Sequence, residues 1–366
     1  MKRLIIKNIG PLKEVDIALS KINLIIGPQS TGKSCILKIA SFCAWLEKTI
    51  NVFQLSEDSI NKDNLKEWLI IYHNLQGYIK SGSFIEYESD NLSLSIAFDN
   101  YSTSFRWKKG KNEYRRSKIS YVVAERNILS VVPNWFEINL PNNSIRNFMK
   151  EWQNARNNLK DKKELSILNT CVKYNFDKHN NTDKIILSNG IELSLQTISS
   201  GLQSLIPLYI IIDYISNGIY DSPLMSVKDL DNNTTKYDHS DIYLEEPEEN
   251  LFPETQMDLV NWLAEIVNGE RNHSLFIATH SPYIMSAFNN LIQAGDIIEE
   301  SPEKKAEVEK IIGGNRAIKY DDVAAFAIAN GSVHSIKDDE LRLMSPSELD
   351  TVSDDISNIF NQLLEL

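Results

Sequence analysis

The chain has 366 residues, of which 42% are hydrophobic and 24% charged, and a formal net charge of -12. These values are typical of a globular protein with one large core or two smaller ones, and the acidic balance argues against a protein covered in nucleic acid. No run of about 18 apolar residues occurs, and the N-terminus lacks the apolar segment of a signal peptide, so we expect neither a membrane span nor export. The cysteines, Cys35, Cys43 and Cys171, have no metal-binding spacing and indicate reduced thiols in a cytoplasmic protein.

The first elements are short strands. Apolar segments over residues 4–9 and 14–17 predict two strands joined at Gly10, and residues 22–26 predict a third, buried strand. Apolar residues then recur at helical spacing from Ser34 to about residue 50. The chain therefore begins with three strands that lead into a helix.

The loop between the third strand and this helix fits the pattern G-x-x-x-x-G-K-[ST]. Its residues are Gly27, Pro28, Gln29, Ser30, Thr31, Gly32, Lys33 and Ser34. The glycines allow a tight turn whose backbone N–H groups face an anion, the lysine ammonium reaches phosphate oxygens, and the serine hydroxyl is a ligand for Mg²⁺. The pattern predicts a site for ATP and Mg²⁺; the alternative is an ordinary glycine-containing turn between a strand and a helix.

The next segments predict a helix followed by a β meander. Residues 64–79 carry apolar side chains at helical spacing, and residues 83–88, 92–98 and 102–107 alternate in polarity as antiparallel strands do. Residues 106–118 then hold seven basic side chains and a single acid. This strip could contact nucleic acid or an acidic partner, and the alternative is a solvated hairpin tip.

The middle of the chain is more polar. Residues 121–127 predict a buried strand that ends in the charged pair Glu125 and Arg126. These side chains could contact the metal or the attacking water, and the alternative is a structural ion pair. Residues 143–178 predict a compact helical lobe, too short for a long coiled coil, and residues 215–240 predict a surface insertion.

Residues 198–203 open an apolar helix and include Ser199, Ser200, Gly201 and Gln203. A serine and a glycine at a helix start can present a hydroxyl, a free N–H and the positive helix end to a phosphate. Taken alone, this segment predicts only an N-cap.

Two later strands end in polar residues. Residues 241–245 lead directly into acids, of which we expect Glu245 to hold Mg²⁺ through water and Glu246 to orient or deprotonate the attacking water. Residues 275–279 lead into His280, which we expect to contact the γ-phosphate. In the tail, the patterns predict helices over 303–312 and 320–329, a strand over 333–336 and an amphipathic helix over 349–364.

These segments, in this order, resemble the ABC-type ATPases of the SMC, RecF and OLD group. Residues 27–34 resemble the Walker A motif, residues 198–203 the signature, residues 244–253 the Walker B motif with its D-loop, and His280 the switch histidine. Within the group, the segments around Glu246 and His280 are most similar to the stand-alone AAA-15/AAA-21 type ATPases. Members of that set often serve bacterial anti-phage systems, in the manner of the PARIS and Septu ATPase components.

The resemblance implies an α/β P-loop NTPase fold of the ABC-head type, with a mixed sheet, an antiparallel β meander and an inserted helical lobe. It divides the chain into a first ATPase lobe over 1–140, a helical lobe over 141–192, a second ATPase lobe over 193–300 and a C-terminal extension over 301–366. Gln29 and Glu245 depart from the usual Asn and Asp at their positions. The residues after His280 show no acidic nuclease cluster, so we expect no fused nuclease.

The resemblance also implies how the chain works. The signature of one chain would cap ATP held by another, so ATP would join two copies head to tail, and hydrolysis would release them. We expect a homodimer, with a higher oligomer left open, that controls a separate effector such as a nuclease. The alternatives are a DNA-repair ATPase that clamps DNA directly, a transporter subunit and a nucleotide-dependent scaffold that does not hydrolyse ATP.

Overall fold

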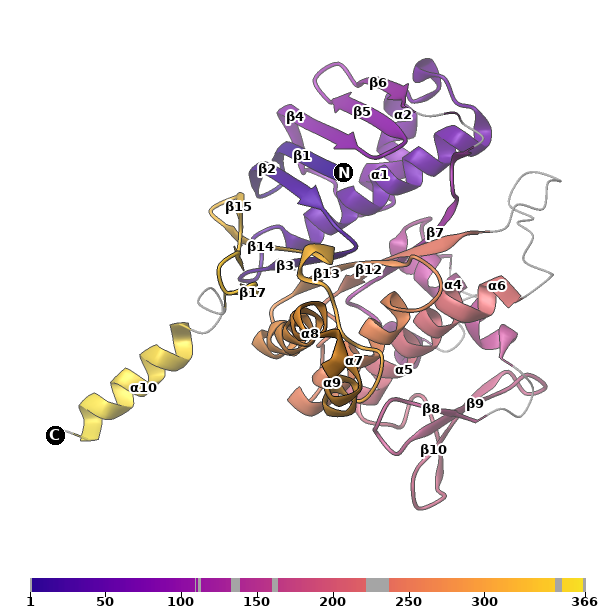
Figure 1. The fold of residues 1–366 in the computed structure, drawn as a ribbon. Helices are drawn as coiled ribbons and strands as arrows, with labels where there is room; N and C mark the ends of the chain where they lie inside the picture. The colour runs from indigo at the N-terminus through magenta and orange to yellow at the C-terminus, as the bar shows by residue number, and fades with distance from the viewer. Residues whose placement is uncertain are drawn as a thin grey trace.

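The computed structural model describes residues 2–108, 110, 113–132, 139–159, 164–221, 237–345 and 351–364. Its main feature is an 11-stranded sheet with the strand order β6-β5-β4-β1-β2-β15-β14-β3-β13-β12-β7 (Figure 1). The strands of this sheet are β1 (Lys2–Ile9), β2 (Leu12–Leu19), β3 (Ile22–Ile26), β4 (Ile79–Glu88), β5 (Leu92–Ala97), β6 (Ser102–Trp107), β7 (Ser117–Val122), β12 (His239–Glu245), β13 (Ser274–Thr279), β14 (Val323–Ala329) and β15 (Ser332–Ser335).

Strands β14, β3, β13, β12 and β7 run parallel. All five residues of β3 are buried, which explains why the strand reads as a continuous apolar run. Ile26 pairs with Thr279, and Glu245 pairs with Ala278. This register brings the residues that follow β3, β12 and β13 to one edge of the sheet.

Strands β1, β2, β4, β5 and β6 form the antiparallel part of the sheet. Burial alternates along β5, so one face packs on the core while the other is more exposed. The predicted α/β class, the mixed sheet and the meander over 83–107 are confirmed.

Helix α1 lies between the two parts of the sheet (Figure 1). Glu47 of α1 accepts hydrogen bonds from Tyr87 of β4 at 3.0 Å, and Ala40 of α1 accepts one from Tyr243 of β12 at 3.4 Å. Helices α5, α7 and α8 cover the other face of the parallel strands (Figure 1). The helices of the described chain are α1 (Lys33–Phe53), η1 (Glu57–Ser59), α2 (Lys62–Leu65), η2 (Lys66–Ile71), α3 (Ile128–Val131), α4 (Ser144–Asn158), α5 (Ser200–Asp213), η5 (Tyr214–Gly218), α6 (Ile219–Asp221), α7 (Pro253–Val267), α8 (Pro282–Glu300), η6 (Pro302–Lys304), α9 (Lys305–Ile312), η7 (Tyr320–Asp322) and α10 (Thr351–Leu364).

The helical lobe over 143–178 is only half helical. Helix α4 is followed by a four-stranded sheet with the order β11-β10-β9-β8. Tyr174 and Phe176 are buried on β9 with a period of two, and Asp177 accepts hydrogen bonds from the backbone of a tight turn. The many polar residues of this segment obscure the alternation of buried and exposed side chains, so the sequence does not indicate these strands. The strands are β8 (Leu165–Ser166), β9 (Lys173–Asp177), β10 (Thr182–Ile186) and β11 (Glu192–Ser194).

The helix predicted over 64–79 ends early. Its helical part is α2 and the π-helix η2, which stop at Ile71. Asn74 and Gly77 then have φ of 54° and 79°, in the left-handed region that breaks a helix. Ile79 is already the first residue of β4.

The helix predicted over 320–329 is also wrong. After the short η7, residues 323–329 form β14, which lies between β3 and β15 in the centre of the sheet. Alanine-rich sequence favours a helix locally, but pairing with β3 and burial on both faces outweigh that preference. Residues 323–335 of the predicted extension therefore belong to the main sheet, and β16 (Lys337–Asp338) and β17 (Leu343–Met344) form a small ribbon after it.

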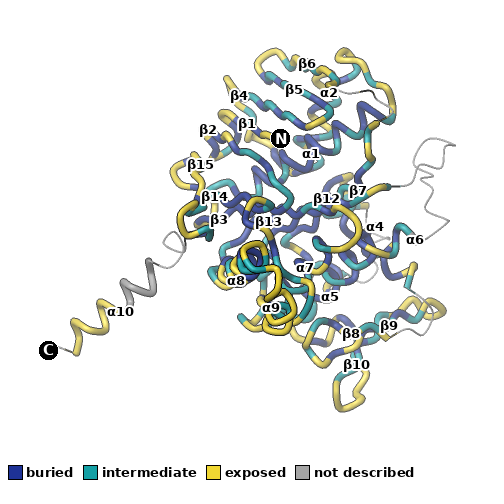
Figure 2. Tube along the Cα trace, in the orientation of Figure 1, coloured by how far each residue is buried: buried dark blue, intermediate teal, exposed yellow. Residues whose placement is uncertain are grey.

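The remaining tail elements agree with the sequence. The predicted helix over 303–312, the strand over 333–336 and the helix over 349–364 correspond to α9, β15 and α10. The described side chains of α10, residues 357–364, are exposed, and the helix points away from the body (Figure 2). In the described part of the chain, no helix is both long and apolar enough to span a membrane. Most of the predicted insertion over 215–240, residues 222–236, lies outside the described residues.

Candidate functional site

The predicted phosphate loop joins β3 to α1. Gly27 and Gly32 have φ of 146° and 111°. A Cβ at Gly27 would lie 2.9 Å from the carbonyl oxygen of Ile328, and one at Gly32 would lie 2.5 Å from the Leu12 side chain. Only glycine fits both the backbone conformation and the space at these two positions. The loop lies at the start of α1, where the N–H groups of the first helical turn are free to bind an anion, as in the P-loop NTPase fold that the sequence predicts.

Lys33 is 4% exposed and its ammonium is turned into the loop. Its Nζ donates to the carbonyl oxygens of Gly27 at 2.8 Å and Pro28 at 2.7 Å. Burial lowers the pKa of Lys33 to about 8, while the negative charges of Glu246 and Glu248 oppose this change. The ammonium is therefore held close to where phosphate oxygens bind in loops of this type.

Lys33 also contacts His280, and His280 contacts Glu246. Lys33 Nζ is 3.2 Å from His280 Nδ1, and His280 Nε2 is 3.1 Å from Glu246 Oε1. A protonated lysine can only donate, so Nδ1 accepts and Nε2 carries the proton that is donated to Glu246. The hydrogen bond from His280, followed by the nearby positive charges, holds the pKa of Glu246 below its ordinary value despite partial burial. The three predicted side chains therefore lie side by side.

Two backbone features hold this arrangement. Glu246 has φ of 43°, which is rare for a residue with a side chain, and its N–H donates to the carbonyl oxygen of Ala278 at 2.8 Å. The N–H of His280 donates to Glu248 Oε1 at 2.6 Å. The sequence indicates no role for Glu248, because an acid two residues beyond Glu246 is typical of a solvated acidic turn.

Glu245, the predicted metal residue, is 4% exposed. Its Oε1 accepts a hydrogen bond from the Tyr121 hydroxyl at 2.6 Å and lies 4.0 Å from Lys38 Nζ, and its Oε2 accepts from the N–H of Ala124 at 3.3 Å. Ser34 lies one residue after Lys33 in the first turn of α1. The described residues contain no group of three or more His, Cys, Asp or Glu side chains that could hold a metal. One hydroxyl and one carboxylate nevertheless match the sparse protein ligation that Mg²⁺ has in phosphate sites.

Arg126 is fully buried and has a structural role. Its guanidinium donates to the carbonyl oxygens of Val123, Glu245 and Glu246 at 3.0, 2.7 and 2.8 Å. It also donates to the Ser204 hydroxyl at 3.2 Å and lies 3.5 Å from Glu249 Oε2. Arg126 thus joins the end of β12 to α5. Its acidic partner is Glu249, whereas the neighbouring Glu125 is exposed.

The predicted signature residues lie at the start of α5. Ser199 is the N-cap residue of α5, and Gly201 approaches the loop after β12 so closely that a Cβ there would lie 2.7 Å from the Asn250 carbonyl oxygen. Ser199, Ser200 and Gly201 line a cavity of about 520 Å³ together with the 74% exposed Phe252. Among the described residues that line it, none belongs to residues 27–34. Gln203 donates instead to the backbone carbonyl of Ile198 at 3.2 Å.

The basic strip over 106–118 is not a hairpin, because β6 and β7 lie at opposite edges of the main sheet. Lys108, Arg115 and Lys118 have acidic neighbours at 3.6, 3.8 and 2.5 Å. Lys109 and Lys111 lie outside the described residues. The pairing of these three cations lowers the charge available to a nucleic acid.

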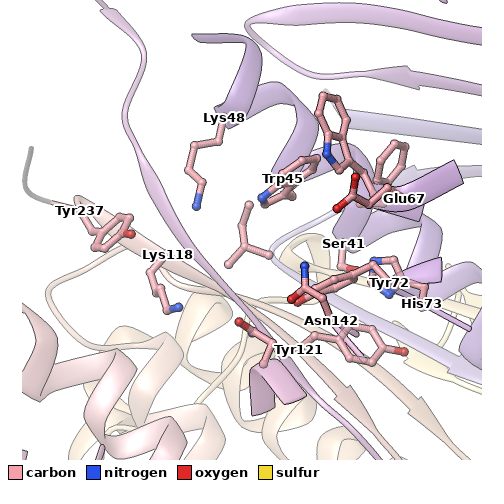
Figure 3. A pocket seen from close by; sticks show the side chains of 14 residues that line it. Ser41, Trp45, Lys48, Glu67, Tyr72, His73, Lys118, Tyr121, Asn142 and Tyr237 are labelled. Atoms are coloured by element: carbon pink, nitrogen blue, oxygen red, sulfur yellow. The ribbon is translucent and has the colours of Figure 1, made fainter. Parts of the chain in front are cut away.

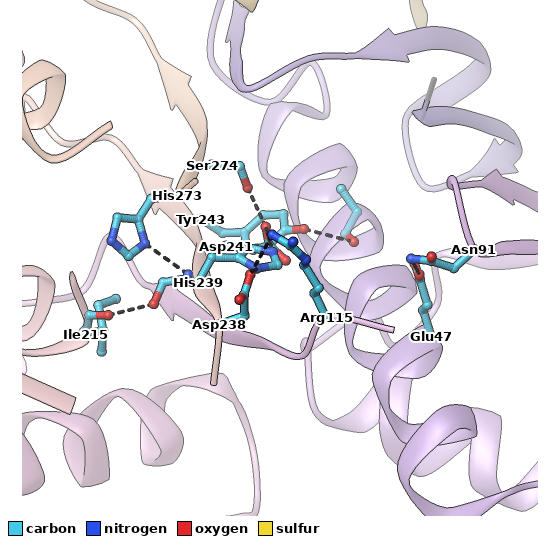
Figure 4. Close-up of polar contacts among 12 residues, drawn as sticks. Glu47, Asn91, Arg115, Ile215, Asp238, His239, Asp241, Tyr243, His273 and Ser274 are labelled. Carbon is cyan, nitrogen blue, oxygen red and sulfur yellow. Dashed lines mark hydrogen bonds and ion pairs between the residues drawn. The ribbon is translucent and has the colours of Figure 1, made fainter. Parts of the chain in front are cut away.

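A second polar cluster surrounds the start of β12, at the opposite end from Glu245 (Figure 4). Arg115 contacts Asp238, the N–H of Ser240 donates to His273 Nδ1 at 3.0 Å, and Ser274 donates to Asp241. Burial opposes ionisation of Asp241, but nearby positive charges and this hydrogen bond hold its pKa below the ordinary value. These groups satisfy one another, which indicates a structural cluster.

Part of the chain matches a known protein family. Residues 136–285 match the family model described as "AAA ATPase domain". The matched segment includes residues 199–203, Glu245, Glu246 and His280, and the phosphate loop lies before it. No curated protein matches the chain. This match, together with the contacts among Lys33, His280 and Glu246, supports an ATPase.

Solved structures show a distant likeness. The SMC head domain from Thermotoga maritima is 11% identical with a TM-score of 0.43, over 91% of this chain and 97% of that one. The Smc head from Pyrococcus furiosus, bound to the C-terminal domain of ScpA, is 9% identical with a TM-score of 0.41, over 98% and 100%. A dimeric ATP-binding cassette protein bound to ADP and Pi is 11% identical with a TM-score of 0.32, over 90% and 96%. At such identities and scores, the likeness supports no conclusion about activity.

Proposed function

We propose that the protein is an ATP-binding and ATP-hydrolysing switch that dimerises around ATP and controls a separate effector. The observation that supports it most directly is the contact series from Lys33 through His280 to Glu246. A phosphate-binding cation, a histidine and a carboxylate at the ends of three adjacent parallel strands are what hydrolysis of a bound triphosphate requires.

Residues 27–34 would hold the phosphates of ATP, with the backbone N–H groups of the loop and the Lys33 ammonium as donors. Glu246 would orient the attacking water and accept its proton, because its carboxylate is partly exposed and its lowered pKa keeps it ionised at neutral pH. His280 would position Glu246 through the hydrogen bond from Nε2 and donate to the γ-phosphate after a change of partner.

Ser34 and Glu245 would hold Mg²⁺, Ser34 directly and Glu245 through water. Mg²⁺ at this position supplies charge neutralisation for the β- and γ-phosphates. Tyr121 fixes one oxygen of Glu245 and the Ala124 N–H contacts the other, so the carboxylate has a single orientation. The chemistry of a hydroxyl and a carboxylate fits the preference of Mg²⁺ for oxygen ligands.

The proposed dimerisation is supported by the position of the signature residues at a surface cavity. Ser199, Ser200, Gly201 and Gln203 line or flank a surface cavity that shares no described lining residue with the phosphate loop. We therefore propose that they contact the ATP of a second copy, so that each of two equivalent sites takes residues from both chains. ATP bound at both sites would favour the dimer by mass action, and hydrolysis would remove that contribution.

The biological role rests on the resemblance of the sequence to ATPases of anti-phage systems. We propose that the output is delivered by a separate protein, such as a nuclease. Copurification with the product of a neighbouring gene would support this role. Salt-dependent, ATP-stimulated affinity for plain duplex DNA would instead favour a DNA-clamping ATPase.

The variant Glu246→Gln tests the central claim. The amide keeps the size of the side chain but cannot accept a proton, so we expect turnover to fall by at least about 10²-fold while ATP binding remains. The variant should accumulate as an ATP-dependent dimer in size-exclusion chromatography with light scattering. Glu270→Gln, at an exposed loop position, is the matched control. If Glu246→Gln hydrolyses ATP like the wild type, the assignment of Glu246 is wrong.

A further inference from the structure

A cavity of about 370 Å³ lies between α1, η2 and β7, and the candidate ATP site does not use it (Figure 3). Its lining from α1 includes Ser41, Trp45 and Lys48, all further along the helix than Lys33. The lining residues in the described part of the chain include no member of the phosphate loop. The size is in the range of sites for small molecules.

One side of the cavity is aromatic. Trp45 of α1 and Trp68 of η2 contact each other with ring centroids 5.3 Å apart and planes at 68°. Tyr72 also lines the cavity, and its ring packs against His73 with centroids 4.8 Å apart. Trp and Tyr rings provide flat apolar surfaces on which a planar ring can stack. Glu67 lies on the same side, where its carboxylate could accept a hydrogen bond from a ring N–H.

The other side holds two lysines, Lys48 and Lys118. Figure 3 shows Lys48, Lys118 and Tyr237 together, across the cavity from Tyr72 and His73. Lys48 Nζ lies 5.6 Å from the centroid of the Tyr237 ring. Lys118 Nζ contacts Glu151 Oε1 at 2.5 Å, which fixes the direction of the ammonium. Glu151 already balances the charge of Lys118, so Lys48 is the cation that would meet an anionic group, such as a phosphate or a carboxylate, at this end of the aromatic cavity.

A buried imidazole lies in the wall of the cavity. His73 is 3% exposed, and its Nδ1 has no hydrogen-bond partner in the described part of the chain. Burial, aided by the positive charge of Lys38, lowers the pKa of His73 to about 3, so the ring is neutral at physiological pH. A polar atom that entered the cavity could pair with this nitrogen after a small ring movement. Such a nitrogen is costly in a closed apolar core and is more easily explained at a ligand site.

The cavity is connected to the candidate ATP site through Tyr121. The Tyr121 side chain lines the cavity and its ring packs edge-on against His73, with centroids 5.5 Å apart. Its hydroxyl donates to Glu245 Oε1 at 2.6 Å. A molecule that shifted the Tyr121 ring would therefore move a hydrogen bond that orients the proposed metal carboxylate.

We propose that this cavity binds a small planar aromatic molecule with one anionic group, of the size of a nucleoside monophosphate, and that its binding changes ATP turnover through Tyr121. The binding half of this inference stands independently of the proposed function. The regulatory half rests on it, since it requires that the protein hydrolyse ATP.

Binding can be measured on the full-length protein by calorimetry and by quenching of tryptophan fluorescence. The probes are AMP, GMP, CMP, UMP and indole-3-acetate, and adenosine is the uncharged analogue of AMP. We expect at least one anionic probe to bind with a Kd below about 1 mM, and Lys48→Met to weaken it at least about tenfold. Lys66→Met, on the exposed side of η2, is the matched control and should bind like the wild type.

Lys33→Met separates this cavity from the phosphate loop. Binding that survives Lys33→Met but falls in Lys48→Met supports the cavity. The inference is overturned if no probe binds, if adenosine binds as tightly as AMP, or if Lys33→Met abolishes binding while Lys48→Met leaves it intact.

The regulatory half is tested by adding a saturating amount of the bound probe to an ATPase assay. We expect kcat to change at least about threefold in the wild type and in Lys66→Met, and the change to be lost in Tyr121→Phe, which keeps the ring without the hydroxyl. A probe that binds without changing wild-type turnover, or that acts equally on Tyr121→Phe, overturns this half alone. If the wild type does not hydrolyse ATP, the proposed function and the regulatory half both fail, whereas the binding result stands.

Discussion

The Nε2 atom of His280 lies 3.1 Å from Oε1 of Glu246, and this contact joins the ends of two adjacent strands. Sequence spacing cannot place these residues together, because 34 positions separate them. The parallel register of β12 and β13 does so, since Glu245 pairs with Ala278 and the next residues of both strands leave the sheet at the same edge.

The contact predicts a shift in the pH dependence of ATP hydrolysis. The hydrogen bond from His280 is the largest cause that lowers the pKa of Glu246. Removing this hydrogen bond in His280→Ala should raise the pKa of Glu246, so the carboxylate would become protonated at a higher pH. The acidic limb of the plot of kcat against pH should therefore shift to higher pH. We also expect kcat at neutral pH to fall by about 10²-fold, as for loss of a positioned acid–base partner. His179→Ala, at an exposed turn, should keep the wild-type profile, and an unshifted acidic limb in His280→Ala would contradict the assignment.

The lowered pKa of Lys33 predicts that the affinity for ATP falls at alkaline pH. Its pKa is lowered to about 8, so the free protein loses this positive charge as the pH rises through that value. Phosphate binding needs the charged form, and the Kd for ATP should therefore rise above pH 8 by up to about tenfold per pH unit. Titration with ATP from pH 7 to pH 9.5 measures this slope. Lys33→Arg keeps its charge throughout, so its Kd should stay flat over the same range; an equal slope in both proteins would rule out Lys33 as the titrating group.

The contacts of Arg126 predict that its substitution greatly lowers the free energy of unfolding. The guanidinium is 0% exposed and serves carbonyl groups at the end of β12, the Ser204 hydroxyl and Glu249. Arg126→Met leaves several of these groups without a donor, and we expect the free energy of unfolding in urea to fall by about 3–5 kcal/mol. Glu125→Gln changes the exposed neighbour and should alter it by less than about 0.5 kcal/mol. Comparable effects of the two substitutions would show that Arg126 does not hold the strand end.

The parts of the site that the sequence predicts are those in which the residue type itself carries the chemistry. The glycines at 27 and 32, Lys33, and the polar residues after the apolar strands could all be located because a buried strand ends where its apolar run ends. The role of Arg126 could not be read in this way, since most of its partners are backbone carbonyls that leave no mark on the sequence. For the same reason, the sequence does not reveal the hydrogen bond from the His280 N–H to Glu248.

The differences between the predicted and the observed fold have another cause. Residues 323–329 contain four alanines and resemble a helix locally, yet they are the central strand β14. Residues 165–194 are rich in polar side chains, yet Tyr174, Phe176 and Ile185 form the buried side of a small sheet. In both segments, pairing with strands distant in the sequence decides the structure, and local propensity is too weak to show it.

The proposal that Ser199 contacts the ATP of a second copy predicts complementation between two inactive variants. Lys33→Met removes the phosphate-binding charge, and Ser199→Arg places a long side chain at the N-cap of α5, so each variant should lose ATP hydrolysis as a homodimer. If each site takes its phosphate loop from one chain and its signature from the other, a mixed dimer contains one intact site and one doubly altered site. An equal mixture should therefore recover about a quarter of the wild-type rate per dimer, because about half of the dimers are mixed and each has one working site of two.

Measuring phosphate release over mixing ratios from pure Lys33→Met to pure Ser199→Arg should give a bell-shaped curve. Mixing wild type with Glu270→Gln is the control and should give a flat line. A rate that stays at the baseline of the inactive proteins at every ratio, while light scattering shows mixed dimers, would mean that the two segments act within one chain.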